Sequence, residues 1–252
     1  MIKQRRGGLG GAESGRCQSP AHDALPTVLA LHGAGGGAWE WACWARTWSA
    51  MGGRFVAADF SRAAADPGAC MDKLLASLHL RHIAEKGSVL IGASFGGLVA
   101  CGLAWRLRAR ALVLLNPLPP APFQSLRQEP IEAATGAPLR RWGLDARLAG
   151  TQASLPELRA GEALLAFRRW VDFAGPLLVE AQSGFHVEPP DCPVLVVQSD
   201  GDDVIDRRAV EAMVAEWRAS HLRLPGSHVS PLLGSGWWQA FDGVRAWLVA
   251  LD

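Results

Sequence analysis

Short apolar runs separated by helix-length segments are the feature that most constrains how this chain of 252 residues can fold. A short apolar run bounded by Gly, Pro or Asp is typical of a parallel strand that is buried on both faces. Alternation with amphipathic segments predicts an α/β fold with a mostly parallel, doubly wound sheet of about six strands. The expected strands are 27–31, 55–58, 88–91, 111–115, 194–198 and 221–224, and the expected helices are 39–51, 69–85, 95–108, 207–219 and 237–251.

One long segment interrupts the alternation. Residues 117–192 are rich in Pro, Arg and Trp and are too long for a simple crossover between neighbouring strands. We predict that they form a helical cap inserted over the carboxyl edge of the sheet, where ligands bind in such folds. The core would then consist of residues 25–116 and 193–252. Residues 1–24 lack apolar periodicity and are predicted to be a mobile tail.

Composition narrows the classes of partner. The 25 Lys and Arg residues are balanced by 24 acidic residues and are spread along the chain, so we expect no nucleic-acid partner. Five Cys residues without a Cys-x-x-Cys pair indicate neither a disulfide framework nor a zinc ribbon. No apolar run reaches the roughly 18 residues that span a bilayer, and no signal peptide is evident. We therefore expect no membrane association and a cytoplasmic location.

Ser94 lies in a Gly-x-Ser-x-Gly run that directly follows one of the expected strands. The order of strand, tight turn and helix is that of a nucleophile elbow, in which a strained turn lifts the serine hydroxyl clear of the sheet. Such a turn needs small residues two positions before and two after the serine, and Gly92 and Gly96 stand there. Taken alone, the motif also fits a glycine-rich turn in which Ser94 is only a helix N-cap.

A histidine follows the last expected strand. His228 stands in the loop Leu224-Pro-Gly-Ser-His228, which would place its imidazole at the carboxyl edge of the sheet. An elbow serine needs an imidazole to accept its proton and a carboxylate to orient that imidazole, in the chain order Ser, Asp or Glu, His. His228 is therefore the predicted base.

The loop after residues 194–198 supplies the orienting acid. It carries four carboxylates, and Asp202 is favoured because it follows a small-residue turn and precedes the apolar pair Val204-Ile205. Asp200 is the second choice, and Asp206 fits better as the N-cap of the next helix. The residue after the fourth expected strand is Asn116, so no rival acid stands there.

A glycine-rich loop, His32-Gly-Ala-Gly-Gly-Gly-Ala-Trp-Glu-Trp41, follows the first expected strand. Its backbone can direct an amide at a developing oxyanion, and Ala34 is the residue expected to do so. The amide of Phe95, the residue after the nucleophile, would complete an oxyanion hole.

Two segments partly match known cofactor or metal motifs. Gly33-x-Gly35-x-x-Ala38 also matches a dinucleotide-binding fingerprint, with Asp59 about 20 residues on. A short-chain dehydrogenase needs a catalytic Tyr, however, and the chain has none. The stretch 186–192 resembles part of a zinc deaminase motif, but Leu195 stands where the second Cys is required. We expect neither a cofactor nor a metal.

With these residues in view, residues 25–252 resemble the α/β-hydrolase superfamily. The spacing His32-Gly-Ala-x-x-Gly37-x-Trp39-x-Trp41 and the stretch Ser230-Pro-Leu-Leu233 are similar to the methylesterase and hydroxynitrile lyase branch. The resemblance implies Ser94 as nucleophile, Ala34 and Phe95 as oxyanion donors, and an apolar pocket under the cap. Gly33 and Val229 stand where the lyases carry Thr and Lys, which disfavours cyanohydrin cleavage. Ala93 and Phe95 replace the His and Leu usual beside the serine, so the pocket wall differs.

The predicted function is a serine hydrolase that cleaves small carboxylic esters through an acyl-enzyme, with a small-molecule acyl compound as substrate. Two alternatives stay open: a thioesterase or acyltransferase acting on carrier-bound acyl groups with the same triad, and a non-catalytic binding protein that keeps the fold. The residues expected to bind substrate are Gly35, Trp39, Trp142 and Trp170.

Overall fold

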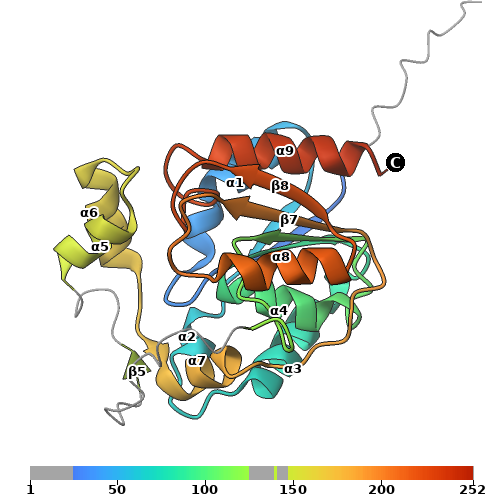
Figure 1. Cartoon of the computed structure of the whole chain (residues 1–252), viewed down its shortest axis with the longest axis horizontal. Helices are drawn as coiled ribbons and strands as arrows, with labels where there is room; N and C mark the ends of the chain where they lie inside the picture. Colours follow the sequence, from blue (N-terminus) through green and yellow to red (C-terminus); the bar gives the residue numbers. More distant parts are fainter. Residues whose placement is uncertain (1–24, 125–138, 141–146, 252) are drawn as a thin grey trace, which may run out of the picture.

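The computed structural model describes residues 25–124, 139–140 and 147–251. Six strands form one sheet in the order β2-β1-β3-β4-β7-β8, and every neighbouring pair is parallel (Figure 1). This confirms the predicted α/β fold. The strands are β1 (Val28–Leu31), β2 (Phe55–Ala58), β3 (Val89–Ala93), β4 (Ala111–Leu115), β7 (Val194–Ser199) and β8 (Ser220–Leu224).

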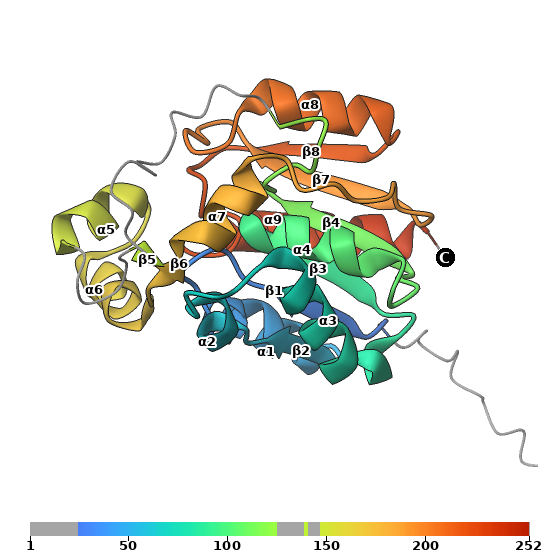
Figure 2. The ribbon, with the colours of Figure 1, turned by 90° about the horizontal axis from the view of Figure 1, so that it is seen from below.

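Helices cover both faces of the sheet. One face carries α1 (Ala42–Ala50) and α9 (Trp237–Val249), and the opposite face, seen in Figure 2, carries α3 (Met71–Arg81), α4 (Phe95–Ala104) and α8 (Arg207–Glu216). Two predicted helices are shorter than expected, because 3-10 turns occupy one end of each: η1 (Ala38–Trp41) precedes α1, and η2 (Ile83–Glu85) follows α3. A short helix that was not predicted, α2 (Ser61–Ala64), follows β2.

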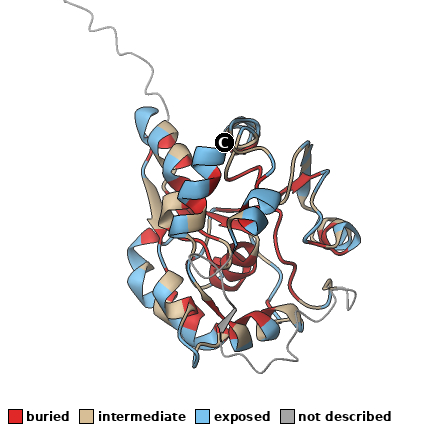
Figure 3. Ribbon diagram, turned by 90° about the vertical axis from the view of Figure 1, so that its left-hand side faces the viewer, coloured by how far each residue is buried: buried red, intermediate tan, exposed pale blue. Residues whose placement is uncertain are grey.

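The core forms one layer on each side of the sheet because successive strand residues point to opposite faces. In β1, Val28 and Ala30 pack into the layer under α1 and α9, whereas Leu29 and Leu31 pack into the layer under α3, α4 and α8. Fully buried Trp44 and Trp48 of α1 meet Phe241 of α9 edge to face. The four central strands β1, β3, β4 and β7 are buried throughout, and Figure 3 shows the inward helix faces as buried and the outer helix faces as exposed.

The described residues of the segment between β4 and β7 include three helices. The segment contains α5 (Leu148–Ser154), α6 (Ala160–Arg169) and α7 (Gly175–Gln182), together with an antiparallel pair that was not predicted, β5 (Leu139–Arg140) and β6 (Phe173–Ala174). The arrows of β7 and β8 point toward α5 and α6 in Figure 1, so these helices lie beyond the carboxyl ends of the strands. Glu180 of α7 accepts a hydrogen bond from the amide of Met71, 2.9 Å away, which ties α7 to α3.

The chain topology places two loops side by side at the carboxyl edge. From β1 the chain moves outward to β2 and then returns to β3 on the other side of β1, where Leu31 is in register with Gly92. Ligands of open α/β sheets bind at such a switch point, in the crevice between the two loops. The glycine-rich loop and the serine turn are those loops. In the part of the chain that the structure describes, no helix is long and apolar enough to cross a membrane.

Candidate active site

Ser94 lies on the sharp turn between β3 and α4, with φ of 52° and ψ of −121°. A residue with a side chain rarely adopts a positive φ, and such strain persists only where neighbouring contacts enforce it. Here the Ser94 amide donates to the Leu115 carbonyl at 3.0 Å, and the Ser94 carbonyl accepts from the Leu118 amide at 2.9 Å. Both ends of the turn are thus fixed to β4 and its loop, and Ser94 lines a cavity.

The glycines around Ser94 are required by close backbone contacts. A Cβ atom on Gly92 would lie 2.2 Å from the Gly96 carbonyl oxygen, and one on Gly96 would lie 2.3 Å from the Leu31 carbonyl oxygen. The second contact joins the turn directly to the end of β1. The elbow inferred from small residues therefore has a steric basis, and α4 begins immediately beneath the glycine-rich loop.

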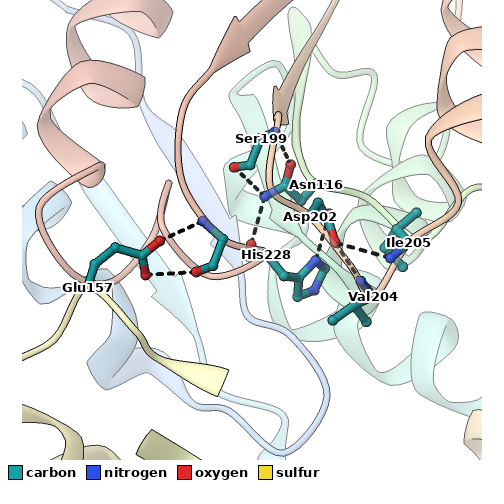
Figure 4. Close-up of polar contacts among 8 residues, drawn as sticks. Asn116, Glu157, Ser199, Asp202, Val204, Ile205 and His228 are labelled. Atoms are coloured by element: carbon teal, nitrogen blue, oxygen red, sulfur yellow. Dashed lines mark hydrogen bonds and ion pairs between the residues drawn. The ribbon is translucent and has the colours of Figure 1, made fainter. Parts of the chain in front are cut away.

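His228 and Asp202 form a hydrogen-bonded pair. The distance from His228 Nδ1 to Asp202 Oδ2 is 2.9 Å, and the two side chains are 12% and 5% exposed. The other carboxylate oxygen of Asp202 accepts from the amides of Val204 and Ile205 at 2.9 and 3.1 Å (Figure 4). The backbone thus holds the carboxylate, and the carboxylate in turn leaves Nε2 of the imidazole free to face the cavity.

The other acids of the same loop are engaged elsewhere. Asp200 accepts from Arg223 Nε at 2.9 Å on the surface, where both side chains are largely exposed. Asp206 accepts from the Arg208 amide at 2.8 Å and is the N-cap of α8, as predicted. Asp202 is the carboxylate of this loop that is hydrogen-bonded to His228.

Asn116 joins the ends of three strands behind this pair. Its amide nitrogen donates to the His228 carbonyl at 2.7 Å and to Ser199 Oγ at 2.9 Å, while its side-chain oxygen accepts from the Ser199 amide at 2.7 Å (Figure 4). Asn116 is 1% exposed. Sequence analysis considered this position only as the place of a rival acid, and the structure shows that it supports the backbone of the histidine.

Glu157, in the loop between α5 and α6, also contacts the histidine loop. One carboxylate oxygen accepts from the Ser227 amide at 2.6 Å and the other accepts from Ser227 Oγ at 2.8 Å (Figure 4). Sequence analysis did not predict this contact, because it joins residues 70 positions apart. The segment between β4 and β7 is thereby hydrogen-bonded to the residue that precedes His228.

A cavity of about 600 Å³ brings the predicted site residues together. Its lining includes Ser94, His228, Ala34, Phe95 and Trp170. Asp202 lies behind His228 and is not part of the lining. The remaining wall is mostly apolar, with Leu115, Leu118, Leu178, Val204, Ile205, Val229, Leu232 and Leu233 among its residues.

Two residues expected to bind substrate are not part of that wall. Gly35 uses its carbonyl to accept a hydrogen bond from the Val171 amide at 2.9 Å, and Trp39 lies under the guanidinium of Arg169, 5.7 Å from its ring centre. Both are occupied in contacts with the segment between β4 and β7. Trp142 lies outside the described residues.

Two buried titratable groups lie in the glycine-rich loop and η1. His32 is stacked on Phe60 at 3.8 Å, donates from Nδ1 to the Gly33 carbonyl and accepts the Phe60 amide at Nε2. Burial lowers the pKa of His32 to about 4, so it is neutral near pH 7. Burial raises the pKa of Glu40 to about 7, although the indole of Trp170 donates to Glu40 Oε1 at 2.9 Å.

Most of the chain matches a known protein family. The model of the "Alpha/beta hydrolase family" matches residues 28–241. The chain belongs to the alpha/beta hydrolase family. The resemblance found in the sequence is thereby confirmed, and membership supports a hydrolase. Comparison with curated proteins yields no match to this hydrolase.

Solved structures show the same fold at low sequence identity. Methylketone synthase I of tomato, with 2-tridecanone bound, is 15% identical with a TM-score of 0.70 over 91% of this hydrolase and 100% of that chain. A methylesterase of Arabidopsis is 16% identical with a TM-score of 0.66, covering 90% and 100%. A thioesterase domain from the curacin biosynthetic pathway is 17% identical with a TM-score of 0.62, covering 89% and 91%. These structures include a methylesterase, in agreement with the resemblance predicted from the sequence. At such low identity, what they share with this chain is the fold alone.

The described residues offer no metal site. No group of three or more His, Cys, Asp or Glu side chains among them is arranged to hold a metal ion. In the glycine-rich loop, the Glu40 carboxyl lies against Gly36, where a Cβ atom would be 2.2 Å from Glu40 Oε2.

Proposed function

We propose that this protein is a serine hydrolase that cleaves small carboxylic esters through an acyl-enzyme on Ser94. The observation that carries the proposal is the shared cavity: the strained serine and the imidazole held by Asp202 both line it. A mostly apolar cavity of about 600 Å³ suits an acyl group with a short alcohol.

The mechanism follows from the direction of each group. Asp202 accepts a hydrogen bond from the Nδ1–H group of His228, so Nε2 is the nitrogen that takes the proton of Ser94 as the hydroxyl oxygen attacks the ester carbonyl. No hydrogen bond joins the Ser94 hydroxyl to the imidazole among the contacts of this structure, and such bonds commonly tighten when substrate binds. The amides of Ala34 and Phe95 stabilise the oxyanion, and His228 protonates the departing alkoxide. Water then repeats the sequence on the acyl-enzyme.

Hydrolysis of matched esters and thioesters tests this proposal. The wild type is expected to hydrolyse p-nitrophenyl butyrate with a kcat/KM above that for butyryl-pantetheine, and Ser94→Ala and His228→Ala are expected to lower kcat by about 10⁴-fold or more. A clear preference for the thioester would instead establish the thioesterase alternative. Absence of turnover of either compound by folded protein would favour the non-catalytic binding protein.

A further inference from the structure

The charged side chains known to line the cavity are acidic. Two acidic residues, Glu40 and Asp203, belong to the lining, and no Lys or Arg is found among the described residues that line it. Asp203 is exposed, so water and salt screen its charge. Glu40 is 7% exposed, and a charge at that depth is screened far less.

The Glu40 carboxyl is held in place and only partly paired. Its Oε1 accepts from Trp170 Nε1 at 2.9 Å, while its Oε2 is buried without a hydrogen-bond partner. The carboxyl lies against Gly36 in the glycine-rich loop, two residues from Ala34. It therefore stays buried and lines the same cavity as Ala34 instead of turning into solvent.

We propose that Glu40 determines the charge selectivity of the site: it accepts esters that are neutral around the scissile bond and discriminates against esters that bear a carboxylate, increasingly so as the pH rises. This inference rests on the proposed ester hydrolysis. Glu40 acts on the substrate through its charge and needs no direct hydrogen bond to it. Since the described residues of the wall include no Lys or Arg, a negative group on the substrate would be desolvated there without a basic side chain as partner.

The protonation of Glu40 sets the pH range in which this effect changes. Its pKa of about 7 means that the site gains a negative charge between about pH 6 and 8, with burial as the main cause and the nearby Asp59 carboxylate adding to it. Of the other charged or titratable groups nearby, Asp203 and His228 line the same cavity, His32 lies in the glycine-rich loop, and Arg169 lies over the ring of Trp39.

A pair of esters of equal length isolates this charge. Methyl pentanoate and monomethyl glutarate differ by a terminal methyl group against a carboxylate that stays ionised above about pH 5.5. Release of methanol from each gives the ratio of their kcat/KM values from pH 5.5 to 8.5. Because both substrates use the same catalytic groups, a pH effect on those groups cancels in the ratio. The wild-type ratio, neutral over anionic, is expected to rise on the order of tenfold through a midpoint near pH 7.

Two isosteric variants assign the effect. Glu40→Gln keeps an acceptor for Trp170 and is expected to flatten the pH dependence, whereas Asp203→Asn is expected to keep it. A wild-type ratio that does not change with pH overturns the inference, and this arm needs no variant to fold. Loss of the pH dependence in Asp203→Asn but not in Glu40→Gln also overturns it. If methyl pentanoate itself is not cleaved, the proposed function fails, and the inference with it.

Discussion

Asp202 has two oxygens with different tasks, one on His228 Nδ1 and one on the amides of Val204 and Ile205. The residue two positions earlier, Asp200, has the same chemistry but pairs with Arg223 in solvent. Asp202 and Asp200 are the same residue type in the same loop and differ in the partner they bind. Their Asn variants therefore form a matched pair that tests which acid orients His228.

Asp202→Asn is therefore expected to lower kcat for ester hydrolysis by about 10³ to 10⁴-fold, because an amide cannot hold the imidazole in the required tautomer or stabilise its cation. Asp200→Asn is expected to stay within about threefold of the wild type, since it loses only an exposed ion pair. Steady-state kinetics on both variants decides the point. Comparable losses in the two variants would mean that Asp202 has no special role.

Glu40 and His32 make opposite contributions to the pH dependence of stability. The pKa of Glu40 rises from 4.5 to about 7 on folding, so its contribution is present below about pH 4.5 and is lost as the pH rises to about 7. The pKa of His32 falls from 6.5 to about 4, so its contribution is present above about pH 6.5 and is lost as the pH falls to about 4. The two effects largely cancel between about pH 4.5 and 6.5.

Replacing Glu40 should reveal the pH dependence of stability that His32 contributes. The free energy of unfolding of Glu40→Gln, relative to that of the wild type, is expected to increase by about 3 kcal/mol between about pH 4.5 and 7. Urea unfolding followed by tryptophan fluorescence at several pH values measures the difference. A difference that is independent of pH would show that Glu40 ionises in the folded protein as it does in the unfolded chain.

At the scale of elements, the serine turn depends on the contact of α4 with the end of β1. Gly96→Ala would place a methyl group 2.3 Å from the Leu31 carbonyl oxygen, and backbone atoms cannot yield as a flexible side chain can. The variant is expected to unfold at least about 2 kcal/mol more easily or to fail to fold. Gly161→Ala in α6, where a Cβ meets no atom within 4 Å, is expected to be neutral or stabilising by up to about 1 kcal/mol. Chemical denaturation compares the two, and an equal effect would contradict the steric account.

Strands whose ends are marked by nearby residues could be predicted from the sequence, and strands that depend on distant contacts could not. The strands 55–58 and 111–115 were predicted with the bounds observed, because their apolar runs end at clear changes in polarity. β3 extends to Ala93, beyond the prediction, because Gly92 and Ala93 resemble a turn in sequence but continue the ladder with β4. β5 and β6 are two residues each, too short to carry a periodic signal.

The same dependence on local sequence signals decided which site residues could be predicted. The serine turn and the order Ser, Asp, His could be found because each is marked by its own local motif. Glu40 and Glu157 could not, since the roles of both depend on contacts across 130 and 70 positions of sequence, with Trp170 and Ser227. An acid within a segment of Gly and Trp is the only local signal that Glu40 gives.

At the scale of the whole molecule, the segment between β4 and β7 contacts both loops that carry the proposed chemistry. Trp170 and Val171 bind the glycine-rich loop and η1, and Glu157 binds the loop of His228. Glu157→Ala removes two hydrogen bonds to Ser227 and is expected to lower kcat by about tenfold with a smaller change in KM, because the imidazole is less well positioned. Glu188→Ala, which removes an exposed carboxylate of the same segment, is the control. If Glu157→Ala and Glu188→Ala had equal kinetics, the segment between β4 and β7 would have no role in positioning His228.

The central claim is that the fold activates Ser94, and intact-mass analysis after exposure to a fluorophosphonate tests it most directly. We expect a single adduct on the wild type, no adduct on Ser94→Ala, and much slower labelling of His228→Ala. Folded wild-type protein that takes up no label, or a Ser94→Ala variant that is labelled as readily as the wild type, would contradict it.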